Sequence, residues 1–107
     1  MSFNPHAVAV LRDIAPDIPR GLVTSAYTAK GMAAIPPATR DILREIPDFD
    51  RVGACFISHS AADLDRARVA EIKASGATIL CWTVRSAAQE KICRDVADNV
   101  TFEGYLA

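Results

Sequence analysis

The sequence lacks both the long apolar segment and the excess of basic charge that would point to a membrane or a nucleic acid. No apolar run approaches the roughly 18 residues that a membrane-spanning helix needs. The formal net charge is -1, whereas binding to a phosphate backbone requires a basic surplus. Met1 leads into Ser-Phe-Asn-Pro with no basic and apolar leader behind it. We therefore expect a soluble chain with no nucleic-acid partner and no membrane span.

Cysteine is also scarce, and its spacing excludes the usual disulfide and zinc patterns. The three cysteines form no CxxC pair, and any pairing leaves one unmatched. We expect Cys55, Cys81 and Cys93 to be reduced thiols that pack as small hydrophobic side chains, with no metal or redox role. Free, reduced cysteines of this kind favour a reducing, cytoplasmic location.

The common catalytic motifs are missing as well. There is no glycine-rich phosphate loop, no GxSxG elbow, no HExxH and no carboxylate cluster with the spacing of a divalent-metal site. Most carboxylates fall on expected helix surfaces, where we expect them to be solvated: Asp63, Asp65, Glu71, Glu90 and Asp95. The residues alone therefore predict neither a catalytic group nor a metal site in this chain.

What the sequence does have is enough apolar character for one core. Half of its 107 residues are hydrophobic and 23% are charged, which is typical of a compact globular protein. A chain of this size buries roughly two-thirds of its unfolded surface, so it needs no disulfide or metal to hold it together. One domain over residues 1–107 is the upper limit, and the length is short for a large closed fold.

Helix signals recur along the chain. Asn4-Pro5 matches an N-cap followed by proline at the first helical position. Four residues at helical spacing then predict the apolar face of this helix: Ala7, Val10, Leu11 and Ile14. Further helices are expected after the caps Thr39, Ser60 and Ser86, and the one that starts at Ser60 should run to Gly76.

Short apolar segments between these helices predict four β-strands, at 20–24, 54–58, 78–84 and 99–102. Strands that alternate with helices indicate right-handed βαβ units and a parallel sheet. Two architectures fit this pattern. One is a small open sheet with helices on both faces, and the other is a consecutive part of a (β/α)8 barrel; the pattern alone does not separate them.

Either architecture would place ligand-facing side chains at the carboxyl ends of the strands. His59 follows the second strand, but a histidine without an acid partner is more often structural than chemical. Trp82 shares a face of the third strand with Leu80 and Val84, which fits core packing or the wall of a substrate pocket. Glu103 ends the polar face of the last strand, which fits a solvated pocket or an exposed edge.

Three motifs, taken in order, resemble the C-terminal half of glycerophosphodiester phosphodiesterases: Ser2-Phe3-Asn4-Pro5, Trp82-Thr83-Val84, and the segment from Ala97 to Tyr105. The resemblance covers essentially the whole chain. It implies an α/β fold, the C-terminal half of a (β/α)8 TIM-like barrel with about four parallel strands and crossover helices. Residues 1–107 would then be a single partial domain.

That family hydrolyses glycerophosphodiesters to glycerol 3-phosphate and an alcohol, usually with a divalent cation. Its catalytic histidines and metal-binding carboxylates lie in the first half of the barrel and have no counterpart in this sequence. The resemblance places Phe3 and Trp82 in the wall of the substrate pocket. Glu103 stands where many relatives have an aspartate, and His59 is added as a substrate-binding candidate because it follows a strand.

Two functions follow from these observations. In the first, the chain is the C-terminal portion of a phosphodiesterase of lipid metabolism, lacks catalytic residues and a cofactor of its own, and is inactive alone. Mg²⁺ or Ca²⁺ would serve the full-length enzyme, which would be periplasmic if its other part carried a signal. In the second, the chain is a non-enzymatic half-barrel whose sheet edges and apolar inner face drive association into a homodimer.

Overall fold

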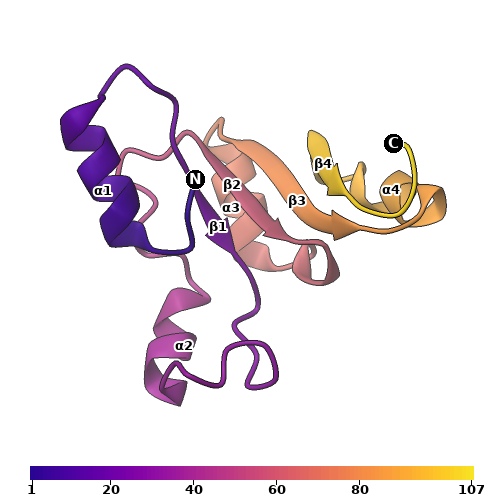
Figure 1. The fold of residues 1–107 in the computed structure, drawn as a ribbon, viewed down its shortest axis with the longest axis horizontal. Helices are drawn as coiled ribbons and strands as arrows, with labels where there is room; N and C mark the ends of the chain where they lie inside the picture. The colour runs from indigo at the N-terminus through magenta and orange to yellow at the C-terminus, as the bar shows by residue number, and fades with distance from the viewer.

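The computed structural model describes residues 1–107 and shows a four-stranded parallel sheet flanked by helices (Figure 1). The strands are β1 (Gly21–Thr24), β2 (Phe56–Ser60), β3 (Thr78–Val84) and β4 (Asn99–Phe102). They lie side by side in chain order, and each neighbouring pair is parallel. This confirms the predicted α/β class with four parallel strands, although β2 begins and ends two residues later than expected.

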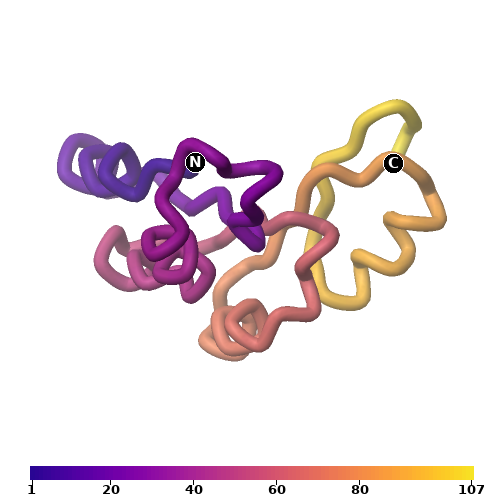
Figure 2. The backbone as a smooth tube through the Cα atoms, turned by 90° about the horizontal axis from the view of Figure 1, so that it is seen from below, coloured from indigo at the N-terminus to yellow at the C-terminus, as the bar shows by residue number.

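The helices are α1 (Pro5–Ile14), α2 (Pro37–Leu43), α3 (Ala67–Ala74) and α4 (Ala87–Cys93), with a short 3-10 turn η1 (Ala61–Asp63) after β2. None of them combines the length and the apolar character needed to cross a membrane. The chain runs from α1 at one end of the long axis to β4 and α4 at the other, as Figure 1 and the trace in Figure 2 both show.

One face of the sheet carries the core. Because side chains alternate along a strand, Leu22, Ile57, Ile79 and Cys81 share the face that packs against the helices. The helices meet them with four buried residues: Val8, Val69, Ile72 and Cys93. The opposite, inner face carries the half-buried side chains of Phe56, Leu80 and Trp82. This one-sided arrangement, with strictly sequential strand order, is that of a barrel segment rather than of an open sheet covered on both faces.

The helix caps are partly as predicted. Asn4 accepts the His6 N–H at 2.9 Å, and Ser86 accepts the Gln89 N–H at 3.1 Å, which confirms both caps. Thr39 is not a cap, because α2 already begins at Pro37, whose fixed φ suits the first helical position. Ser60 is not a cap of α3 either. It ends β2, and the Asp63 carboxylate, needed for a capping box, is bound to His59 and Arg66 instead.

Two expectations about faces are wrong. Val8 is the buried residue of α1, whereas Val10 and Ile14 of the predicted apolar face are 53% and 75% exposed, because the helix turns its Val8 side to the sheet. In β3, the pairing with β4 shifts register between Cys81 and Val84. Val84 therefore joins the buried cluster with Cys81 instead of the inner face with Trp82.

Gly21 and Phe56 are paired neighbours on the inner face, and the glycine makes room for the ring. A Cβ on Gly21 would lie 2.3 Å from the Phe56 Cε2 atom. We expect Gly21→Ala to lower the free energy of unfolding by about 1 to 3 kcal/mol, because the ring must leave its position. Chemical denaturation would measure this, with Gly31→Ala as the control, since the nearest atom there is 3.6 Å away. Adding Phe56→Leu should recover part of the loss; no recovery would contradict the steric explanation.

Candidate functional site

The carboxyl ends of β1, β2 and β3 border a groove of about 530 Å³. One wall is the loop after β1, from Ser25 to Met32, and the other is formed by residues from Ser60 to Asp63. Trp82, near the end of β3, closes the groove. Its volume lies within the range of small-molecule sites, and its position is the one where α/β barrels bind ligands.

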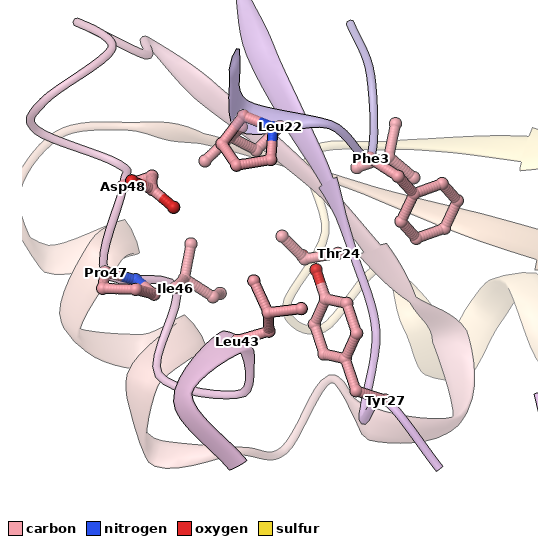
Figure 3. Close-up of a pocket in the computed structure, with 10 residues that line it drawn as sticks. Phe3, Leu22, Thr24, Tyr27, Leu43, Ile46, Pro47 and Asp48 are labelled. Atoms are coloured by element: carbon pink, nitrogen blue, oxygen red, sulfur yellow. The ribbon is translucent and has the colours of Figure 1, made fainter. Parts of the chain in front are cut away.

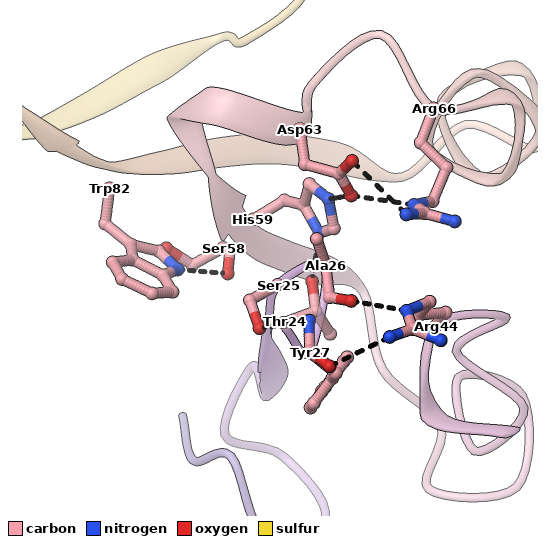
Figure 4. Close-up of polar contacts among 10 residues, drawn as sticks. All are labelled: Thr24, Ser25, Ala26, Tyr27, Arg44, Ser58, His59, Asp63, Arg66 and Trp82. Carbon is pink, nitrogen blue, oxygen red and sulfur yellow. Dashed lines mark hydrogen bonds and ion pairs between the residues drawn. The ribbon is translucent and has the colours of Figure 1, made fainter. Parts of the chain in front are cut away.

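The Trp82 ring is held in place on two sides. Its indole Nε1–H donates to the Ser58 carbonyl oxygen at 3.0 Å (Figure 4). The Phe3 ring packs against it in an edge-to-face arrangement, with centroids 5.6 Å apart and planes at 83°. The structure thus brings Phe3 and Trp82 together from distant parts of the chain. With its N–H already bonded, Trp82 offers a ligand an apolar face and no hydrogen-bond donor.

A second pocket lies behind Phe3, between β1 and the segment from Leu43 to Asp48 (Figure 3). It has room for about 10 Å³, which is about enough for a single water molecule. Tyr27 closes this pocket, and its burial, followed by the nearby charge of Asp48, raises the pKa of its hydroxyl to about 12. The phenol is therefore protonated at neutral pH, and the pocket is too small for a substrate.

His59 lies on the helix side of the sheet, with none of its surface exposed. Figure 4 shows it on the opposite side of β2 from Trp82. Its Nε2 lies 2.9 Å from Asp63 Oδ2, and its Nδ1 lies 2.7 Å from Thr24 Oγ1. A carboxylate only accepts hydrogen bonds, so Nε2 carries the proton and, in the neutral ring, Nδ1 accepts from the Thr24 hydroxyl. This bonding ties β1, β2 and η1 together behind the groove.

Asp63 was expected to be a solvated charge, and this is wrong. It accepts hydrogen bonds from His59 and from Arg66, whose Nε and Nη2 lie 2.7 and 3.3 Å from its two oxygens. Desolvation alone would raise the pKa of Asp63, but the hydrogen bonds from Arg66 and His59 outweigh it and lower the pKa. His59 therefore does have an acid partner. In the sequence, the signal for this contact was the position of Asp63, four residues after His59 and three before Arg66.

Arg44 is a site residue that the sequence did not reveal. From just beyond α2 it donates to the carbonyl oxygen of Ala26 at 2.6 Å and to that of Tyr27 at 3.1 Å (Figure 4). These bonds hold the loop that forms one wall of the groove, and Tyr27 has a left-handed φ of 51° there. An arginine that binds backbone carbonyls leaves no sequence motif, so its role becomes visible only in the fold.

Glu103 lies apart from the other candidates. Its exposed carboxylate pairs with Arg85 at 3.5 Å, and it does not line the groove. Nowhere does the chain bring together three histidine, cysteine or acidic side chains that would suit a metal ion. Because Asp63 is already bonded to Arg66 and His59, the residues at the groove do not form a donor set for Mg²⁺ or Ca²⁺.

The buried His59 gives the fold a testable pH dependence. Burial lowers its pKa from the ordinary 6.5, although the hydrogen bond to Asp63 acts in the opposite direction. Since the unfolded chain then binds a proton more readily than the folded one, stability rises with pH up to about 6.5 and falls as the pH drops below it. We expect urea midpoints to decrease from neutral pH to about pH 5. The decrease should shrink in His59→Gln and persist in His6→Gln, which changes the exposed histidine; equal slopes in both variants would contradict this.

No family model and no curated protein matches this sequence. Its fold, however, matches solved structures. A phosphodiesterase from Oleispira antarctica, in complex with the product sn-glycerol-3-phosphate, superposes with a TM-score of 0.66 at 22% identity, over 94% of this chain and 36% of that one. A protein from Silicibacter pomeroyi named as a glycerophosphoryl diester phosphodiesterase superposes with a TM-score of 0.70 at 20% identity, over 95% of this chain and 33% of that one.

The chain thus spans about a third of the length of these two proteins. At such low identity the likeness establishes the fold, which is that of part of a TIM barrel. It decides between the two architectures that the sequence pattern left open, and it confirms the resemblance in fold that the three motifs carried.

Proposed function

We propose that this chain is the C-terminal portion of a glycerophosphodiester phosphodiesterase, in which Phe3 and Trp82 form a wall of the substrate pocket. The observation that carries the proposal is the fixed aromatic pair beside a groove of about 530 Å³ at the carboxyl ends of the strands. The product complex of the Oleispira antarctica phosphodiesterase, which has this fold, supports a glycerol phosphate as the class of ligand. The proposal includes a role in lipid metabolism and a cytoplasmic location.

The same geometry supports inactivity of the chain alone. Hydrolysis of a phosphodiester requires neutralisation of the phosphoryl oxygens, a positioned water molecule and an acid for the leaving group. The titratable residues that line the groove are Tyr27, which stays protonated, and Asp63, whose charge is taken up by Arg66. Neither neutralises a phosphoryl group, so the groove binds the organic part of a substrate while groups outside this chain carry out the reaction.

Trp82 provides a direct assay, because it is the single tryptophan. Titration with sn-glycerol 3-phosphate should change its fluorescence with a saturable, weak affinity, and inorganic phosphate should not. Phe3→Ala should weaken the response because the Phe3 ring packs against Trp82 and holds it beside the groove. Glu103→Gln should leave the response unchanged, because Glu103 pairs with Arg85 and does not line the groove. An unchanged tryptophan signal in the wild-type protein would contradict the proposed pocket. Turnover of glycerophosphocholine with Mg²⁺ or Ca²⁺ that is lost in Trp82→Ala would contradict inactivity.

A second candidate function is that of a non-enzymatic assembly module. The inner face favours it, because no helix covers that side and Phe56, Leu80 and Trp82 are only half-buried there. An uncovered apolar face of this kind promotes association, most simply as a homodimer. Sedimentation at micromolar concentrations that shows only a compact monomer would contradict this role.

A further inference from the structure

The side chains that line the groove combine an aromatic face with hydroxyl groups. Trp82 of β3 presents its indole ring, whose N–H is already bonded to the Ser58 carbonyl oxygen. Ser25 and Thr28, on the loop after β1, and Ser60, at the end of β2, each add a hydroxyl to the lining. An apolar ring beside hydroxyls suits a ligand that has both a carbon–hydrogen face and hydroxyl groups of its own.

Each of these hydroxyls keeps its proton free for a ligand. Ser25 Oγ accepts the Tyr27 N–H at 3.0 Å, and Thr28 Oγ1 accepts the Gly31 N–H at 3.3 Å. Neither oxygen donates to another residue, and the Ser60 hydroxyl does not cap the turn that follows it. A hydroxyl can donate one hydrogen bond and accept two. The lining can therefore both donate to and accept from the hydroxyl groups of a ligand.

The charge in the groove is already balanced. Asp63, the one lining residue that is ionised at neutral pH, accepts hydrogen bonds from Arg66 at 2.7 and 3.3 Å and from His59 (Figure 4). Tyr27, the other titratable residue of the lining, has a pKa of about 12 and stays protonated. A quaternary ammonium group would gain from the face of Trp82. It would, however, meet a carboxylate that Arg66 has neutralised, and the positive charge of Arg66 would oppose it.

We propose that the groove binds a neutral cyclic polyol, such as inositol or a hexose, in preference to glycerol and to amino alcohols. The inference rests on the phosphodiesterase function proposed above and specifies the alcohol part of its substrate. A ring polyol stacks one carbon–hydrogen face on Trp82. Its hydroxyl groups reach Ser25, Thr28 and Ser60. Glycerol has no ring to stack, and choline has a single hydroxyl and a positive charge. A groove of about 530 Å³ has room for a substituted six-membered ring.

The fluorescence of Trp82 can rank the candidate alcohols directly. Wild-type protein would be titrated with myo-inositol, glucose, glycerol and choline chloride at constant ionic strength, with N-acetyltryptophanamide in parallel to correct for effects of the solutes on indole itself. We expect myo-inositol or glucose to saturate at a concentration about 10-fold lower than glycerol, which corresponds to one or two additional hydrogen bonds. Choline chloride should change the signal no more than the same concentration of sodium chloride.

A hydroxyl deletion tests the contacts against a matched control. Ser60→Ala should weaken the binding of the cyclic polyol by about 3- to 10-fold, because one hydrogen bond to the ligand is lost. Ser75→Ala removes a hydroxyl that bonds the Ile72 carbonyl oxygen before β3 begins, at the other end of the strands from the groove. This control should bind like the wild type. Equal losses in the two variants would overturn the proposed hydroxyl contacts.

The outcomes separate the choice of alcohol from the proposed function. A response to sn-glycerol 3-phosphate without tighter binding of either cyclic polyol than of glycerol would overturn the inference and leave the substrate pocket in place. Choline binding as tight as that of the cyclic polyols would also overturn it, in favour of a cation on the face of Trp82. No response to any of these compounds, sn-glycerol 3-phosphate included, would overturn both the inference and the proposed pocket.

Discussion

Replacing Ile79 with alanine is expected to remove about 2 to 5 kcal/mol from the free energy of unfolding, the usual cost of such a truncation in a packed core. Ile79 has none of its surface exposed and lies near the start of β3, one of the two strands that pair with a neighbouring strand on both sides. Domains of this size are stable by roughly 5 to 15 kcal/mol, so a large part of the stability would be lost. Urea unfolding followed by circular dichroism would measure the change.

The matched control is Ile92→Ala, which removes the same atoms from a side chain that is 72% exposed on α4. Under conditions where the protein is monomeric, it should change the stability by less than about 0.5 kcal/mol. A similar loss in the two variants would show that the sheet face of β3 does not carry the core. Because the groove lies at the carboxyl end of the same strand, Ile79→Ala should also reduce the change in Trp82 fluorescence on addition of sn-glycerol 3-phosphate.

Features that depend on neighbours in sequence could be predicted well. The bounds of β3 follow from the run Thr78–Val84, whose many β-branched and aromatic residues are typical of a buried strand. The caps Asn4 and Ser86 bond to backbone groups two and three residues ahead, so their chemistry is local. The Ser2-Phe3 and Trp82 motifs also named two aromatic residues that the fold brings into contact.

Features that depend on register or on distant partners could not be predicted. The position of His59 behind the groove follows from its pairing with Thr24, which lies 35 residues earlier in the chain. Val84 does not share a face with Trp82, because the pairing of β3 with β4 shifts register before Val84. The buried side of α1 depends on where the sheet lies, since the helix has apolar residues on more than one face. In each case tertiary contacts select among alternatives that the local pattern allows.

Loss of the Asp63 carboxylate is expected to cost about 1 to 3 kcal/mol, because Asp63→Ala leaves the His59 Nε2–H without an acceptor in a site from which water is excluded. The Arg66 guanidinium loses its partner as well, although its partial exposure lets water replace part of that interaction. Stability at neutral pH would be measured by urea unfolding, with Asp65→Ala, an exposed carboxylate two residues away, as the control.

The pH profile separates loss of the hydrogen bond from a general loosening of the loop. In the wild type, Asp63 favours the protonated form of His59 while burial disfavours it. Without the carboxylate, burial acts unopposed and the pKa of His59 falls further. The decline in stability below pH 6.5, the ordinary value for a histidine, should therefore be steeper in Asp63→Ala than in the wild type. The same decline in both proteins would mean that Asp63 does not govern the protonation of His59.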